Sequence, residues 1–368
     1  MKKQSYFLII LLLIISVLAS CSSNSENNSS SSNLPAAKGA ESEIYIVMDS
    51  AHWNSELGDA IKETFAMAIP GLPRDEPLFS IKYVNPLQFT GFLKQATNLL
   101  FVTTLENNSR QGQRMKSFFT QESLQMIQDK PDMYRFILKD QYARGQMVLH
   151  LFGQSPSQVI NKITENRENL QQVFLKPEIK RLTKKIYSGV EETGLMKTLL
   201  QKYDFYLKIP ANYKLAKERD NFLWIRHYNH DIDKNLLIYH QEYDDESVFE
   251  DQNIFELREK ISQQYLRDIE DTSIYMVTET LVPITTKKIN FDGKYAVETR
   301  GLWKLSDISM GGPFLSYLFV DEKRNRLYYI EGYVASPGKT KRLTMRELEI
   351  ILNTFKTREE YEEIKKNS

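Results

Sequence analysis

The sequence predicts an α+β protein with antiparallel sheets and grouped helices, arranged as two α+β units behind a leader and a polar linker. Aromatic residues make up 11% of the chain, with 20 Tyr and 19 Phe, which favours strands over an all-helical bundle. Many of the apolar runs are joined by short turns, as in hairpins. The helical segments form groups and do not alternate with single strands, which also favours antiparallel pairing.

Residues 1–20 are predicted to be a bacterial lipoprotein signal peptide. Two lysines at positions 2 and 3 precede an apolar run from Phe7 to Ile15, which is too short for an ordinary membrane span. The run ends in Leu-Ala-Ser-Cys at residues 18–21, which resembles the lipobox of lipoprotein signal peptidase. We therefore expect Cys21, the only cysteine, to become the lipidated first residue. The alternative is an ordinary signal or short anchor with an incidental cysteine.

The predicted anchor is a set of acyl chains, palmitate among them, because one chain alone binds a membrane marginally. Ser22 follows the cysteine where an aspartate would favour the inner membrane, so the outer membrane is expected. Few acids follow the cysteine, which favours the periplasmic face. Residues 21–41 are rich in Ser and Asn and are expected to form a flexible linker.

The first unit is expected to span residues 42–203. Its predicted strands are Glu43–Met48, Leu78–Val84, Asn98–Leu105 and a hairpin of Met133–Lys139 with Met147–Phe152. Its predicted helices are Ser55–Ala68, residues 111–128, a helix opened by Ser155 and Pro156, a helix that begins at Pro177, and residues 191–202. The apolar spacing and the proline and glycine positions support these assignments.

The second unit is expected to span residues 204–356 and to be richer in strands. The predicted strands are 205–209, 213–217, 222–228, 236–243, 274–281, 284–291, 295–302, 315–320 and 327–335. Asp292-Gly293 is a strong hairpin signal. One helix is predicted over 254–269, and Thr344 with Glu347 forms a capping box that would open the last helix. Residues 357–368 are expected to be a charged, frayed tail.

Composition excludes several classes of function. The 48 basic and 48 acidic residues give no bulk charge that would attract nucleic acid. One cysteine excludes a disulfide framework and a multi-thiolate metal site. The chain contains neither a G-x-S-x-G elbow nor an H-E-x-x-H motif, so no catalytic residue, metal or cofactor is assigned. His227, His230 and His240 lack tight ligand spacing, and ordinary exposed histidines at a hairpin end are the favoured interpretation.

Residues 301–342 contain the least generic motifs of the chain. Clustered aromatics can stack on sugar rings, and a basic loop before a helix can hold an anion such as a phospholipid headgroup. The candidate binding residues are Trp303, Gly311, Gly312, Pro313, Tyr333, Lys339, Lys341 and Arg342. The favoured alternative is that the aromatics belong to the core and that the basic loop is a solvated turn, because Phe, Tyr and Leu alternate as strand faces do.

Several phrases resemble a known family. They are residues 209–213, 222–226, 301–303, 312–314 and 331–339, together with the lipobox. With them the chain resembles an uncharacterised lipoprotein family of Bacteroidota, domain of unknown function 4837, over most of the mature sequence. The resemblance implies a cell-envelope setting and brings no activity, substrate or catalytic residue.

The sequence therefore predicts a membrane-anchored envelope lipoprotein that is a non-catalytic binding or assembly module. Its expected partners are the membrane, through the lipid anchor, and an envelope protein or glycan. The alternatives are a glycan- or lipid-binding protein that uses segment 301–342, and a hydrolase of envelope polymers.

Overall fold

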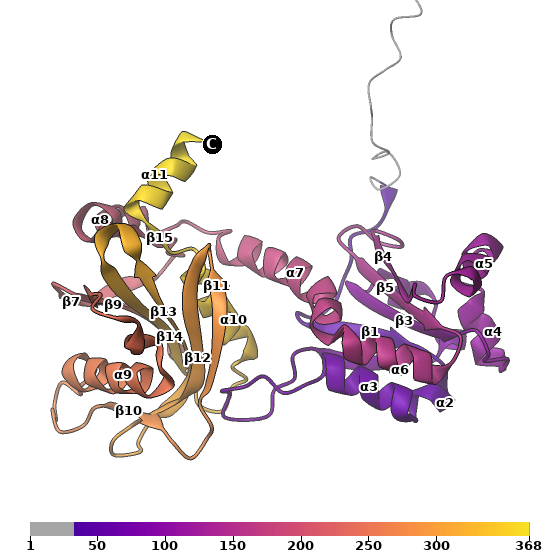
Figure 1. Cartoon of the computed structure of the whole chain (residues 1–368), viewed down its shortest axis with the longest axis horizontal. Coiled ribbons are helices and arrows are strands. Elements are labelled where there is room, and N and C mark those ends of the chain that lie inside the picture. Colours follow the sequence, from indigo (N-terminus) through magenta and orange to yellow (C-terminus); the bar gives the residue numbers. More distant parts are fainter. Residues whose placement is uncertain (1–32, 368) are drawn as a thin grey trace, which may run out of the picture.

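The computed structural model describes residues 33–367. In Figure 1 the described chain forms two units, each built on its own sheet, and the long helix α7 (Arg167–Ile186) leads from one to the other. The predicted α+β class is confirmed. No helix among the described residues has both the length and the hydropathy that crossing a membrane requires.

The first unit contains a five-stranded sheet in the order β2-β1-β3-β5-β4. Its strands are β1 (Glu43–Val47), β2 (Ser80–Val84), β3 (Asn98–Thr104), β4 (Arg135–Lys139) and β5 (Met147–Gly153). Strands β2, β1, β3 and β5 run parallel, whereas β4 pairs antiparallel with β5. The expected β4–β5 hairpin is thus confirmed, but antiparallel pairing is wrong for the rest of this sheet. Connections that contain helices bring the chain back in the same direction.

Helices cover both faces of this sheet. The unit contains α2 (Ser50–Trp53), α3 (Glu56–Phe65), α4 (Arg110–Lys116), α5 (Gln121–Asp129), α6 (Pro156–Glu165) and the short turns η2 (Pro86–Gln88) and η3 (Gly91–Gln95). Helices α3, α6 and α7 bury apolar residues against one face, and α4 packs on the other. The predicted helix start at Pro177 is wrong, because α7 begins at Arg167 and contains this proline. Buried Leu170, Phe174 and Leu182 hold the helix in place despite the lost hydrogen bond.

The end of the expected linker is attached to the first unit. The amide of Ala37 donates to the carbonyl of Arg144 at 2.9 Å, and that of Lys38 donates to Gln95 at 2.8 Å. Flexibility is therefore wrong for this part of residues 21–41. The backbone pairs explain the difference, because they satisfy polar groups that a mobile spacer leaves to water.

The second unit contains an antiparallel eight-stranded sheet in the order β10-β12-β13-β14-β9-β8-β7, with β11 also paired to β12. Its strands are β7 (Lys214–Arg219), β8 (Phe222–Tyr228), β9 (Asp233–Glu242), β10 (Met276–Glu279), β11 (Thr285–Phe291), β12 (Lys294–Leu305), β13 (Gly311–Asp321) and β14 (Arg326–Ala335). Here the predicted antiparallel pairing is confirmed. Alternate residues of the central strands enter two separate apolar clusters on the two faces.

Each face of this sheet is covered by helices. Helix α9 (Asp251–Tyr265) packs on one face, and α8 (Thr193–Tyr203) and α10 (Arg342–Leu352) pack on the other. The remaining elements are η4 (Glu246–Phe249), η5 (Glu322–Arg324), the two-stranded ribbon of β6 (Phe205–Tyr206) with β15 (Lys356–Thr357), and α11 (Arg358–Lys366).

The expected frayed tail is wrong, because most of it is helix α11. Thr357 and Glu360 form a reciprocal capping box at its start. Tyr361 stacks on Tyr206, with ring centroids 4.3 Å apart, and so attaches the helix to the β6–β15 ribbon. This local cap and one aromatic contact order a highly charged segment.

Polar contacts join the two units. Arg342 on α10 donates to the carbonyl of Pro77 at 2.6 Å, and Arg346 donates to Ser42 Oγ at 2.6 Å. Pro77 lies in the connection of α3 to β2, which extends toward the second unit in Figure 1. These contacts seat the first unit against the start of α10.

Candidate functional site

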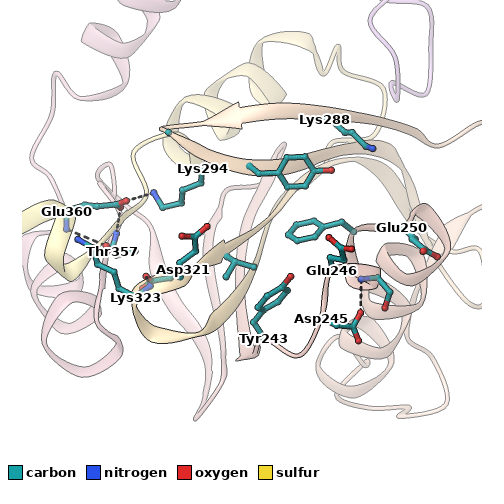
Figure 2. A pocket seen from close by; sticks show the side chains of 16 residues that line it. Tyr243, Asp245, Glu246, Glu250, Lys288, Lys294, Asp321, Lys323, Thr357 and Glu360 are labelled. Carbon is teal, nitrogen blue, oxygen red and sulfur yellow. Dashed lines mark hydrogen bonds and ion pairs between the residues drawn. The ribbon is translucent and has the colours of Figure 1, made fainter.

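A groove with a volume of about 1100 Å³ lies at one end of the second sheet. Four segments that are distant in sequence form it: the stretch after β9, the β11–β12 turn, the β13–β14 turn and the start of α11. Figure 2 shows their side chains converging on the open space. The fold therefore assembles this site from strand ends and turns, where sheet-based proteins commonly place binding residues.

Aromatic side chains form one wall of the groove. The rings of Phe249 and Tyr295 meet edge to face at 5.1 Å, and Tyr243 lies 6.4 Å from Phe249. Tyr295 is half exposed, so its ring is available to a ligand. The wall combines residues that are distant in sequence: Tyr243 and Phe249 lie before α9, and Tyr295 lies near the start of β12.

Asp321 lies on the opposite side, at the end of β13. Its Oδ1 accepts the amide of Lys323 at 3.2 Å and so caps η5. Its Oδ2 has no hydrogen-bond partner within residues 33–367, although the residue is only 4% exposed. Burial raises the pKa of this carboxyl, and the negative charge of Glu359 raises it further. A buried carboxylate oxygen without a hydrogen bond lowers the stability of the fold, unless a ligand supplies a donor.

The charges around the groove are unbalanced. Six carboxylates and three lysines line it. Lys294 already pairs with Glu360, whose other oxygen accepts the amide of Thr357 at 2.9 Å. Figure 2 shows this pair above Asp321 and the acidic segment Asp245–Glu250 across the opening. The groove therefore presents an excess of negative charge beside an aromatic wall.

The aromatic residues predicted as binding candidates are buried. Trp303 is 3% exposed and Tyr333 is 4% exposed, and their rings meet at 5.3 Å. The Trp303 indole donates to the carbonyl of Val334 at 3.3 Å. The favoured interpretation of these rings as core is therefore confirmed, and the alternative that either ring is exposed for a sugar is wrong, because both lie between the sheet and α9.

The paired glycines and the proline have a packing role. A Cβ on Gly312 would lie 2.0 Å from the Val334 carbonyl oxygen, so only glycine fits there. Pro313 is buried, and Gly311 is the exposed first residue of β13. The close neighbour of Gly312 is thus β14, a strand of the same unit.

The basic candidates divide between the unit interface and solvent. The amides of Lys341 and Arg342 donate to the Glu76 carboxylate at 2.7 and 2.8 Å. Lys339 is exposed, with Asp231 at 3.8 Å. None of the predicted site residues lines the groove, and Cys21 lies outside the described residues.

The structure also tests the histidine arrangement. His227 pairs in register with Lys234, whereas the amide of His240 donates to Asn221 at the other end of the β8–β9 hairpin. The two side chains therefore do not face each other. Across residues 33–367, no group of three or more His, Cys, Asp or Glu is arranged to hold a metal ion.

One signal of the groove is present in the sequence. The acidic stretch of residues 242–251 has the composition of a solvated loop, and in the structure it supplies much of one side of the groove. The β13–β14 turn and α11 complete the site only through the tertiary fold.

Comparisons with known proteins find similarity to families of unknown function. No curated protein matches the sequence. A mutant of the protein Mog1 has a TM-score of 0.28 at 9% identity, with 42% of this chain and 90% of that chain covered. The Saccharomyces cerevisiae Ran-binding protein Mog1p has a TM-score of 0.29 at 9% identity, with 43% and 92% covered. Similarities at these scores carry no argument about fold or function.

Two family models divide the folded chain between them. Residues 37–187 match a domain of unknown function (DUF8532), so the predicted resemblance does not extend over this unit. Residues 192–354 match the domain of unknown function (DUF4837), and the resemblance to that family is confirmed for the second unit, which contains most of the groove.

Proposed function

We propose that the protein is a lipid-anchored, non-catalytic binding module of the cell envelope that holds a basic segment of a partner protein in the groove. The observation that carries the proposal is Asp321, a buried carboxylate with one unpartnered oxygen on the wall of an open, acidic cavity. A lysine ammonium or arginine guanidinium from the partner would supply the missing donor in a charge-assisted hydrogen bond.

The aromatic wall suits the same partner. Lysine and arginine carry apolar stems that pack on rings, and their charges are attracted to ring faces. Tyr243, Phe249 and Tyr295 present such rings across the groove from Asp321. A segment that combines basic and apolar side chains thus complements both walls at once.

The size of the groove favours a polypeptide over a metabolite. Its volume of about 1100 Å³ exceeds the range of about 300–1,000 Å³ that is usual for small-molecule pockets. Turns and strand ends from four segments surround it, which leaves an open trough for an extended chain.

The anchor follows from the sequence. The lipobox at residues 18–21 and the polar stretch after it would hold the folded units at a membrane surface, expected to be the periplasmic face of the outer membrane. A tether keeps a weak binding site at high local concentration near other envelope proteins.

Peptide binding to the full-length chain tests the groove. The probe is a labelled nine-residue peptide of alternating lysine and leucine. The control peptide has glutamine in place of each lysine. We expect fluorescence anisotropy to give an affinity for the lysine peptide at least about tenfold higher than for the glutamine peptide. Asp321→Asn keeps the cap of η5 and should remove most of this difference, whereas Glu270→Gln, at an exposed position outside the groove, should leave it unchanged.

Equal affinity for the two peptides, or equal affinity of the Asp321→Asn variant and the parent chain, would overturn the binding proposal. Raising the salt concentration should weaken the interaction of the lysine peptide, because part of it is electrostatic.

Metabolic labelling with a palmitate analogue tests the anchor separately. We expect label in the parent chain and in the membrane fraction of the cells that express it. Cys21→Ala should abolish labelling and leave the signal sequence uncleaved by the lipoprotein peptidase. Labelled protein in the Cys21→Ala sample would contradict the assignment of Cys21.

A further inference from the structure

A row of polar side chains crosses the apolar face of the second sheet beneath α9. Thr286 on β11 is in register with Thr299 on β12, which is in register with Ser316 on β13. Ser316 is in register with Glu331 on β14. The neighbouring residues on this face, such as Val297 and Tyr329, belong to the apolar cluster under α9. Four consecutive strands therefore place a polar residue at the same level of an otherwise apolar face.

At the β14 end of the row, the charged groups are already paired with each other. Arg258 of α9 donates to both Glu331 oxygens, at 2.9 and 3.0 Å, and to Thr278 Oγ1 at 2.7 Å. The Tyr329 hydroxyl also donates to Glu331. Both charges are buried and matched, so this end offers no unpaired charge to a ligand.

The outer part of the row lines a separate cavity of about 290 Å³. Thr286, Thr299 and Ser316 supply hydroxyl groups, while Phe255, Ile284 and Phe314 supply apolar wall. Thr299 is 4% exposed, and its Oγ1 has no hydrogen-bond partner in the described part of the chain. A buried hydroxyl without a hydrogen-bond partner is unfavourable. Because this hydroxyl lies in the cavity wall, a ligand in the cavity could supply the missing partner.

We infer that this cavity binds a small uncharged ligand that carries hydroxyl groups on an apolar ring, of the size of one sugar ring. The buried charges beside the cavity, Arg258 and Glu331, are already paired with each other, which disfavours an ionic ligand that would enter the buried part without a counterion. Asp251, which is exposed, is the other charged residue of the lining, and its carboxylate can accept from a ligand hydroxyl. Threonine and serine hydroxyls both donate and accept, which matches the hydroxyls of a sugar. The ring of Phe255 matches the C–H face of such a molecule, whereas the Arg258 guanidinium already lies over the ring of Phe314, 3.8 Å from its centroid.

This site is independent of the groove. The residues around the small cavity come from α9, from β12, β13 and β14, and from the segment 278–286, and none of them lines the groove. The partner segment and the small ligand would therefore bind the same unit at different places.

Isothermal titration calorimetry and saturation-transfer NMR on the full-length chain test the inference. The probes are methyl β-glucoside, methyl β-galactoside and N-acetylglucosamine, with benzene as an apolar probe. We expect saturable one-to-one binding of at least one sugar and no binding of benzene. Thr299→Val preserves the shape of the side chain and removes the unpartnered hydroxyl, and it should weaken sugar binding about tenfold.

Thr280→Val is the matched control, because Thr280 is exposed and lies outside the cavity, and it should leave the affinity unchanged. A second variant, Thr299→Leu, should fill the cavity and abolish binding. Binding of benzene in preference to the sugars, binding of none of the probes, or unchanged sugar affinity in both Thr299 variants would each overturn the inference.

Discussion

The carboxylate of Glu76 in the first unit caps helix α10 of the second unit. Its Oε1 accepts the amide of Lys341 at 2.7 Å, and its Oε2 accepts the amide of Arg342 at 2.8 Å. No side chain from α10's own N-cap residue does this. A negative charge at a helix start also matches the helix dipole. The contact therefore joins the two units through the end of a helix rather than through an apolar surface alone.

Removal of this cap should loosen the interface. We expect Glu76→Ala to lower the free energy of unfolding of the second unit by about 1–2 kcal/mol, the usual cost of a lost N-cap. Hydrogen exchange followed by mass spectrometry should show faster exchange at the start of α10, where two amides lose their acceptor. Glu106→Ala, at an exposed glutamate of the first unit, is the control. Unchanged exchange at the start of α10 would show that the cap contributes little.

The same helix shows where sequence signals reach their limit. The capping box at Thr344 and Glu347 predicts a start that the structure does not use, because α10 already begins at Arg342. The capping carboxylate belongs to Glu76, which lies 265 residues before Lys341, so no local sequence pattern indicates this cap. By contrast, the capping box of Thr357 and Glu360 is a local pattern that indicates the start of α11. The high charge of residues 357–368 favours a tail instead.

The buried pair of Arg258 and Glu331 should be costly to break from one side. Arg258→Met leaves the Glu331 carboxylate buried without its counterion, and we expect a loss of about 3–5 kcal/mol in the free energy of unfolding. The double variant with Glu331→Gln should recover a large part of this loss, because no unpaired charge remains. Urea denaturation of the single and double variants measures both effects.

The partly buried pair of Arg226 and Asp233 provides the comparison for this prediction. It has the same two-fold geometry, with both bonds at 2.7 Å, but lies near the surface. Arg226→Met should cost no more than about 1 kcal/mol. Similar losses for Arg226→Met and Arg258→Met would contradict the role assigned to burial.

Gly312 allows a direct test of the packing interpretation of the Gly-Gly-Pro motif. In Gly312→Ala the new Cβ would clash with the carbonyl oxygen of Val334, which lies 2.0 Å from the ideal Cβ position. We expect a loss of about 2 kcal/mol or more, or failure to fold, as for other overpacked cores. Gly194→Ala in α8 meets nothing within 4 Å and should be neutral or slightly stabilising. Equal thermal stability of the two variants would refute the interpretation.

Sequence reasoning identified most elements of the fold because their apolar spacing and turns are local. The hairpin at Asp292-Gly293 and the helix capped by Ser155 are both predicted by residues that lie within a few positions of each other in the sequence. The parallel sheet of the first unit was not predicted, because strand direction depends on how the connections cross, not on the strands themselves.

The candidate site was beyond local reasoning for a related reason. Trp303 and Tyr333 are unusual in sequence, but their strand neighbours bury them. Asp321 is an ordinary residue at a hairpin end, and it becomes unusual only because the start of α11 and the segment after β9 close around it. Burial, not residue type, distinguishes it.

His150 predicts a specific acid sensitivity of the first unit. The side chain is buried on β5 and stacks on Phe101, with ring centroids 4.6 Å apart, and neither ring nitrogen has a hydrogen-bond partner among the residues that the structure describes. Burial lowers the pKa of this imidazole from 6.5 to about 4. In the unfolded chain the histidine binds a proton below its usual pKa, while the folded form stays neutral, so stability should fall as the pH drops from 6.5 toward 4.

The lowered pKa corresponds to about 3 kcal/mol once the pH has fallen through this window, with no effect at higher pH. His150→Phe keeps the stacked ring and cannot be protonated, so its stability should depend less on pH there. Pulsed hydrogen exchange of β5 peptides, at one labelling pH after equilibration in urea, measures the first unit separately from His240, whose pKa burial also lowers to about 4. His230→Gln, at an exposed histidine, should keep the parental pH profile, and the same profile in His150→Phe would refute the prediction.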